Sequence, residues 1–275
     1  MEPLAVVLAI AATLALGTWT AGRVTGDASW VDRIWSLAPP VYVAVFAAFA
    51  GFLDPRLDIM ALLAALWGAR LTVNLARRGG YRGVEDHRWA ILRARMSRRR
   101  WIAFDALVIQ LGRHAILVLI ALPALTAYQH RGERFGALDA AASALFLLAL
   151  AGETIADQQQ WDFRAARREA VAQGRAMGPG FPTTGLWAWS RHPNHLFEQL
   201  QWWAFFVLGA AASGTLLQWT ALGALLLTLL VHASTRFTES ISRSRHPGYA
   251  DYARRTPMLL PRPPRVARRE GASRT

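Results

Sequence analysis

Long apolar runs, separated by short polar segments, dominate the sequence. Seven runs are distinguishable, at residues 3–21, 38–53, 57–76, 101–127, 136–156, 195–213 and 214–234. Each is about long enough to cross a bilayer as an α-helix, which rises about 1.5 Å per residue. The pattern therefore predicts an all-α, polytopic membrane bundle of about seven transmembrane helices. A single domain, 1–263, is expected to precede a basic, disordered tail at 264–275.

The distribution of arginine predicts how this bundle is oriented. All 31 basic residues are Arg, and the formal net charge is +13. With the N-terminus outside, 26 arginines fall in cytoplasmic segments and three in outer loops, as the positive-inside rule expects. The C-terminus is then cytoplasmic, and the charge is explained without nucleic acid. The start of the chain has no basic n-region, so no cleaved signal peptide is expected.

Composition also restricts the chemistry. The chain has no Cys and no Lys, which excludes disulfides, thiolate ligands, cysteine nucleophiles and Schiff bases. His, Asp, Glu and Tyr remain as groups that could transfer protons. His192 and His195 are three residues apart but have no third ligand nearby, so no metal site is expected.

A polar segment stands at the start of the sixth run. Pro193 suits the first position of a helix, and Arg191 and His192 precede it where a helix start binds anions. Asn194 and Glu198 are four residues apart and share a helix face. Glu198 would lie inside the apolar layer, where a carboxylate needs a partner. Two interpretations stay open: a ligand site, or a polar collar in which Glu198 pairs with another helix.

Two further polar groups are expected on the same side of the membrane. The fifth run ends with Asp157 and Arg164 on one helix face. The tail, which starts at the end of the last run, contributes His232, Arg236, Glu239, Tyr249, Tyr252 and Arg255. Arginines suit phosphates, and carboxylates suit ribose hydroxyls or an amide, so the mixture favours a nucleotide-bearing cofactor. For the last segment, a basic patch on anionic lipid headgroups is the alternative.

The segment from Gly185 to Glu198, with its Ser-Arg-His-Pro-Asn core, resembles the signature of the steroid 5α-reductase C-terminal superfamily, in particular its bacterial branch of membrane proteins. Residues 77–89 and 252–261 also look like that branch, so the similarity covers about residues 27–263. It implies a seven-helix reductase of the bacterial inner membrane that holds NADPH between the cytoplasmic ends of its last three helices. The family's cofactor-contacting positions match Asn194, Glu198, Asp157 and Arg164.

The chain departs from this family at one functional pair. In steroid 5α-reductases a Glu and a Tyr polarise the 3-oxo group of the substrate, and the nearest positions here are Leu37 and Trp67. A proton donor must therefore lie elsewhere, and the candidates are Asp32, Tyr81, Asp86 and His87.

The resemblance implies hydride transfer from NADPH to a conjugated carbon–carbon double bond of a lipophilic substrate, either steroid-like or another lipid enone. Membrane lipids are the other expected partners. Two alternatives remain open: a membrane methyltransferase that uses S-adenosylmethionine in the same pocket, and a lipid-binding bundle without enzymatic activity.

Overall fold

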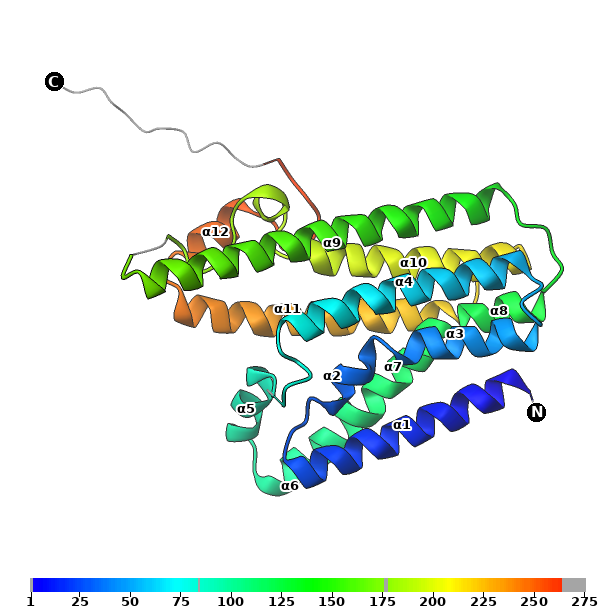
Figure 1. Ribbon diagram of the computed structural model, residues 1–275, viewed down its shortest axis with the longest axis horizontal. Helices are drawn as coiled ribbons and strands as arrows, with labels where there is room; N and C mark the ends of the chain where they lie inside the picture. Colours follow the sequence, from blue (N-terminus) through cyan, green and yellow to red (C-terminus); the bar gives the residue numbers. More distant parts are fainter. Residues whose placement is uncertain (1, 84, 176–177, 264–275) are drawn as a thin grey trace. The chain divides into compact units, whose positions relative to one another are not determined.

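Every regular element in the part of the chain that the computed structural model describes is helical (Figure 1). The described residues are 2–83, 85–175 and 178–263, so the predicted tail at 264–275 lies outside them. The principal helices are α1 (Pro3–Thr25), α2 (Trp30–Trp35), α3 (Ala38–Phe49), α4 (Pro55–Arg77), α5 (His87–Ala94), α6 (Arg98–Phe104), the π-helix η1 (Asp105–Gly112), α7 (Arg113–Ala121), α8 (Pro123–Gln129), α9 (Ala137–Ala172), α10 (Pro193–Ser213), α11 (Ala221–Arg245) and α12 (Tyr249–Arg255).

Five helical segments of the described chain are long and apolar enough to cross a membrane: Pro3–Thr25, Pro55–Arg77, Arg98–Gln129, Ala137–Ala172 and Ala221–Arg245. The prediction of a helical integral membrane protein is therefore confirmed. The second and sixth predicted runs are also helical, as α3 and α10. However, α3 has 12 residues, and the first turns of α10 carry polar side chains that lower its mean hydropathy.

Two helices, α9 and α11, extend beyond the apolar runs that predicted them. Helix α9 continues to Ala172, well beyond the apolar run, and α11 starts at Ala221 and ends at Arg245. His232, Arg236 and Glu239 therefore all lie on α11, which continues past the last run. The basic stretch at 98–100 begins α6, and the preceding helix α5 stops at Ala94. Hydropathy marks the apolar part of a helix, and these helices continue with polar residues.

The described chain divides into two compact units. Among the described residues, unit 1 lies within 2–150 and 199–232, and unit 2 lies within 151–198 and 233–263. The division cuts through α9, α10 and α11, so each of these helices contributes one part to each unit.

Unit 1 has an aromatic and aliphatic core in which α3 packs against α4, α7 and α1. The buried indole of Trp202 lies edge-on to Trp67, with ring centroids 4.9 Å apart, and also contacts Phe205. Helices approach closely where they carry glycine. A Cβ atom added at Gly223 would lie 2.3 Å from the carbonyl oxygen of Leu119 on α7. Small residues at such crossings let membrane helices pack backbone to backbone.

We expect Gly223→Ala to lower the free energy of unfolding by about 1–3 kcal/mol, because the added methyl group would meet backbone atoms that cannot move aside. Gly17→Ala is the matched control, since nothing lies within 4 Å of a Cβ atom at that position on α1. The control should be neutral or slightly stabilising, because Ala favours helix more than Gly does. Thermal unfolding of the two purified variants in one detergent measures the difference. Equal midpoints would contradict the packing shown here.

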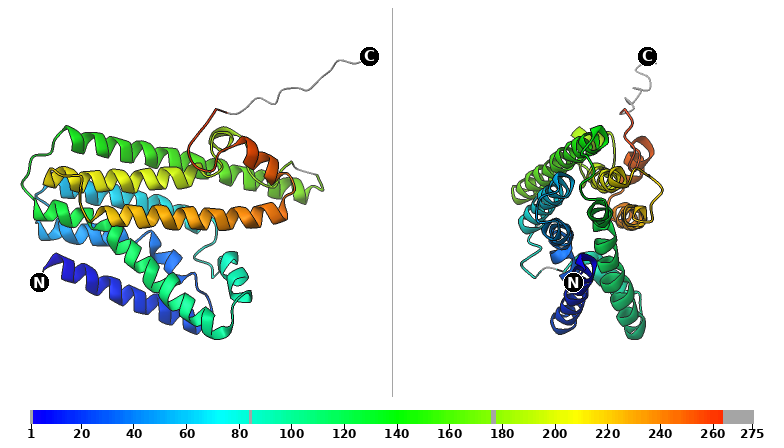
Figure 2. Two further views of the ribbon diagram at one scale, coloured as in Figure 1. Left: turned by 180° about the vertical axis from the view of Figure 1, so that it is seen from behind. Right: turned by 90° about the vertical axis from the view of Figure 1, so that its right-hand side faces the viewer.

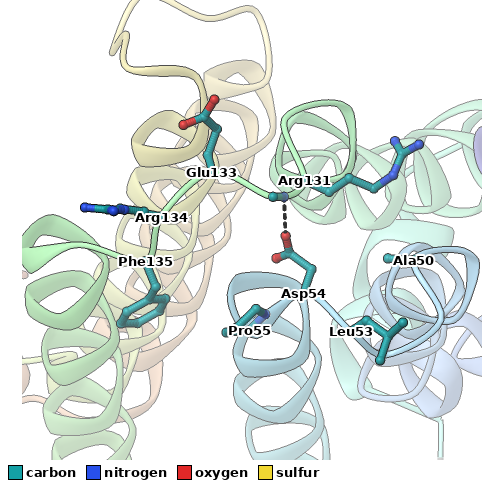
Figure 3. Close-up of a pocket in the computed structure, with 9 residues that line it drawn as sticks. Ala50, Leu53, Asp54, Pro55, Arg131, Glu133, Arg134 and Phe135 are labelled. Carbon is teal, nitrogen blue, oxygen red and sulfur yellow. Dashed lines mark hydrogen bonds between the residues drawn. The ribbon is translucent and has the colours of Figure 1, made fainter.

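A cavity of about 470 Å³ in unit 1 lies between the start of α4 and the loop at residues 131–135 (Figure 3). Asp54 holds the two together, accepting hydrogen bonds from the backbone N–H of Leu57 at 3.0 Å and of Gly132 at 2.9 Å. Figure 3 shows Arg131 and Arg134 pointing away from each other. Because the charged side chains do not converge, this cavity is not the candidate site.

Unit 2 is built from the polar ends of three helices. Its elements are α9 from residue 151, the short 3-10 helix η2 (Gly185–Ala188), the first turns of α10, α11 from residue 233, and α12. Figures 1 and 2 show α12 beside the loop that joins α9 to α10. Phe181 of that loop stacks on Tyr252 of α12, with centroids 5.1 Å apart. Most of the predicted cofactor residues fall in this unit.

Candidate functional site

A buried ion-pair cluster lies in unit 2, around Arg191. Its Nε donates to Oε1 of Glu239 at 2.6 Å, and its Nη2 donates to Oε2 at 3.0 Å. Its Nη1 donates to the carbonyl oxygens of Ala253 and Thr256, at 2.9 and 2.6 Å. A guanidinium group has five N–H donors, and these contacts use four of them.

His192 joins the same cluster. Its Nε2 lies 3.0 Å from Oε1 of Glu239, so the Nε2–H tautomer donates to that carboxylate. The backbone N–H groups of Arg191 and His192 donate to Pro257 and Met258, at 2.9 and 3.1 Å. These contacts fasten the segment before α10 to the end of the described chain.

The structure gives two of the predicted cofactor residues partners within the protein. Arg191 and His192 were expected to hold an anion at the start of α10. In the structure, their side chains and N–H groups instead serve Glu239 and the carbonyl oxygens of residues 253–258. Charge at a helix start binds whatever negative group lies nearest, and here the chain itself supplies that group. We therefore assign Arg191, His192 and Glu239 to holding the site together.

Asn194 and Asp157 meet at the start of α10. The Asn194 Nδ2 donates to Asp157 Oδ1 at 3.4 Å, and the Asp157 side chain is buried. The other polar atom of the amide, Asn194 Oδ1, is buried and has no hydrogen-bond partner among the described residues. Since an unsatisfied buried carbonyl oxygen is costly, this atom is the best candidate for contact with a ligand that donates a hydrogen bond.

His195 and Thr235 extend this polar surface. The Nδ1 of His195 lies 2.8 Å from the hydroxyl of Thr235, which is fully buried on α11. The ring of His195 stacks on His192, with centroids 5.2 Å apart and planes 11° from parallel. Neither residue was among the predicted cofactor residues. The spacing of three from His192 was the available signal for His195, whereas Thr235 gave none.

The two tyrosines of α12 have structural contacts. The Tyr252 hydroxyl donates to the carbonyl oxygen of Trp187 at 2.5 Å, and Tyr249 is buried beside Phe181. Burial raises the pKa of both phenols, and the neighbouring negative charge of Glu239 raises it further. Both hydroxyls therefore remain protonated near neutral pH, which keeps Tyr252 a donor to η2.

The backbone turn before η2 depends on Gln159, which was also not among the predicted site residues. Its Oε1 accepts from the N–H of Leu186 at 2.9 Å, and its side-chain amide closely approaches Gly185. Gly185 has a φ of 61°, a conformation that favours glycine. The indole of Trp187 donates to the carbonyl oxygen of Ala156 at 3.1 Å. Together these contacts fix the approach of the chain to α10.

The remaining predicted cofactor residues lie in unit 2, except for one in unit 1. Glu198 is half-buried on α10 in unit 2. Arg164, Arg236 and Arg255 are exposed and give unit 2 a positively charged surface. His232 falls in unit 1.

The four candidate proton donors lie in unit 1, at the polar segments around α2 and α5. Asp32 pairs with Arg113, and its other oxygen accepts from the indole of Trp89 at 3.5 Å. Asp86 caps α5 by accepting from the N–H of Arg88 at 2.9 Å, and it also pairs with that side chain at 2.7 Å.

Tyr81 is exposed and donates to the carbonyl oxygen of Arg33 at 3.2 Å, and His87 begins α5 with a side chain outside the described part of the structure. The carboxylates of Asp32 and Asp86 thus both accept hydrogen bonds from arginine side chains. The role of these four residues as proton donors stays a prediction.

Comparison with known proteins places the chain in a family. Residues 18–256 match the family described as "Protein of unknown function (DUF1295)". An uncharacterized protein of the fission yeast Schizosaccharomyces pombe is 38% identical over 276 aligned residues, which cover 95% of this chain and 80% of the yeast protein. No solved structure matches the chain. The match spans both units and includes α10 and its polar surroundings, so the chain belongs to the DUF1295 family.

Proposed function

We propose that this protein is a membrane-embedded, NADPH-dependent reductase that acts on a conjugated carbon–carbon double bond of a lipophilic substrate. The observation that carries the proposal is the pair formed by Asn194 and Asp157. It presents a buried amide oxygen without a partner among the described residues, next to a buried carboxylate. The resemblance of residues 185–198 to steroid 5α-reductases supports a nicotinamide nucleotide as the ligand.

The donor set of unit 2 fits such a cofactor. Asn194 Oδ1 suits the N–H group of a carboxamide or a ribose hydroxyl, and the carboxylates of Asp157 and Glu198 suit hydroxyls. The exposed guanidinium groups of Arg164, Arg236 and Arg255 suit phosphates. The guanidinium group of Arg191 is bound by Glu239. NADPH supplies a hydride when bound.

The protein's part is to orient the cofactor and to supply the accompanying proton. The contacts among Arg191, His192 and Glu239 hold the start of α10 in place, so the Asn194 amide stays where it is. Reduction of an enone develops negative charge on its oxygen, which a positioned donor stabilises before a proton is added at carbon. Asp32, Tyr81, Asp86 and His87 remain the proposed donors.

We further propose that α3 and α10 also lie in the membrane, which brings the number of spanning segments to seven. The N-terminus would then be outside, and unit 2 would face the cytoplasm of a bacterial cell. The support for this orientation is the concentration of 26 arginines on that side against three in the outer loops.

We expect Asn194→Ala and Glu198→Ala each to weaken NADPH binding by about tenfold or more, because each removes a hydrogen-bonding group from the proposed contact surface. Asp162→Ala is the matched control, since this carboxylate is exposed on α9. Fluorescence titration of the purified full-length variants with NADPH measures the three dissociation constants. Unchanged affinity in both variants, with well-folded protein, would contradict the assignment.

A further inference from the structure

A second polar site lies in unit 1, at the end of α1 and the start of α6. A cavity of about 230 Å³ opens there, and its charged and aromatic walls are Arg23, Arg93, Trp101 and Asp105. A water molecule takes up about 30 Å³ of liquid, so the space exceeds that of one ordered water. Figure 1 shows the end of α1 beside α6. The proposed reductase chemistry does not use this cavity.

One wall of the cavity is a buried carboxylate. Asp105 is 5% exposed, and it accepts one long hydrogen bond, from Gln110 Nε2 at 3.4 Å. The π-helical stretch from Asp105 to Gly112 brings these residues, five apart, onto one face, and such segments are frequent at functional sites. Thr18 of α1 donates to Gln110 at 3.0 Å, which holds the amide in place. A carboxylate at this depth requires a positive or hydrogen-bonding partner.

Two arginines, Arg23 and Arg93, line the same cavity. Arg93 lies 4.9 Å over the ring of Trp101 and donates from Nη2 to Glu85 at 2.5 Å. Its Nε is buried and has no hydrogen-bond partner among the described residues. Arg23 is exposed in the last turn of α1. Guanidinium groups placed in this way are the usual ligands of a phosphate.

Exposed apolar side chains lie on α1 and η1, the two elements that contribute Arg23 and Asp105 to the cavity. Val24, Leu107 and Val108 are 81%, 62% and 50% exposed, and they lie on α1 and η1, within two candidate membrane spans. Such side chains belong in contact with acyl chains. The cavity therefore presents a phosphate-binding side and a carboxylate to a molecule that also carries hydrocarbon.

We propose that this cavity binds the headgroup of a phospholipid that carries a primary ammonium group, with the phosphate at Arg23 and Arg93 and the ammonium at Asp105. A primary ammonium has three N–H donors for the carboxylate, whereas a quaternary ammonium has none. A quaternary group is bound instead by open aromatic faces, and Arg93 already covers Trp101. The site therefore selects phosphatidylethanolamine over phosphatidylcholine.

The test uses the full-length protein in detergent, with thermal stabilisation titrated against dioctanoyl phosphatidylethanolamine, phosphatidylcholine, phosphatidylglycerol and free phosphoethanolamine. We expect phosphatidylethanolamine to bind about tenfold more tightly than the other two lipids. Asp105→Asn should abolish this preference. Arg23→Gln should weaken all three lipids, and Arg99→Gln, an exposed residue outside the cavity wall, should change nothing.

Three results would overturn the proposal: no preference among the lipids in the unaltered protein, an unchanged preference in Asp105→Asn, or equal binding of free phosphoethanolamine and the lipid. If Asp105→Asn fails to fold, Arg23→Gln decides, because this exposed arginine can be replaced without disturbing the core. Unaltered lipid binding in Arg23→Gln would then count against the site.

Discussion

Arg191→Ala is expected to lower the free energy of unfolding by about 3–5 kcal/mol, because it leaves the buried carboxylate of Glu239 without its bidentate partner. The substitution also removes the donors to the carbonyl oxygens of Ala253 and Thr256. The C-terminal segment should therefore detach before the rest of unit 2 unfolds. Limited proteolysis followed by mass spectrometry detects this as early cleavage near residues 254–255.

Arg243→Ala is the control for this substitution. Arg243 also lies near Glu239, at 3.6 Å, but its side chain is 57% exposed. Water screens an exposed pair, so a change of at most about 1 kcal/mol is expected. Arg191→Lys should give an intermediate loss, since it keeps the charge but not the planar pair of donors. Equal stability of Arg191→Ala and Arg243→Ala would show that the cluster does not hold unit 2 together.

Asp139→Ala is expected to destabilise unit 1 by a similar amount, about 3–5 kcal/mol. Arg56 Nε donates to Asp139 Oδ1 at 2.7 Å and Nη2 donates to Oδ2 at 3.0 Å, and the two side chains are only 2% and 3% exposed. The same guanidinium donates to the carbonyl oxygen of Arg134 at 2.8 Å. Removing the carboxylate leaves a buried positive charge at the start of α4.

The matched control is Asp251→Ala, which removes the acidic partner of Arg254 in a pair exposed on α12. That substitution should change the free energy of unfolding by less than about 1 kcal/mol. Thermal and urea unfolding of both variants in one detergent give the comparison. A loss for Asp139→Ala no larger than for Asp251→Ala would contradict the structural role of the buried pair.

The helical membrane architecture was predictable because a long apolar run indicates residues that face lipid or the protein core. Helix ends were less predictable, since α9 and α11 continue with polar residues to Ala172 and Arg245. The sequence pattern also contained no sign that Asp105 begins a π-helix. π-Helices are rare and usually occur as short segments inside α-helices, so an apolar run by itself predicts an α-helix.

The candidate site was predictable in part. The resemblance to steroid 5α-reductases indicated both Asp157 and Asn194. In the structure, Asn194 Nδ2 lies 3.4 Å from Asp157 Oδ1. Arg191 was expected to bind a ligand phosphate, whereas it pairs with Glu239, 48 residues later in the chain. Local spacing predicts which side chains share a helix face, but it cannot identify a partner on another helix. An ion pair between residues far apart in the sequence therefore determines whether a charged group such as Arg191 can bind a ligand.

The most direct test of the central claim is which cofactor stabilises the purified, full-length protein. Thermal unfolding is measured with NADPH and, separately, with S-adenosylmethionine. For a ligand whose dissociation constant is micromolar, each compound is added at up to about a hundred times that concentration. A ligand that binds only the folded state should then contribute about 2.7 kcal/mol. We expect NADPH to raise the unfolding temperature and S-adenosylmethionine to leave it unchanged. Stabilisation by S-adenosylmethionine alone, or by neither compound, would contradict the proposed reductase.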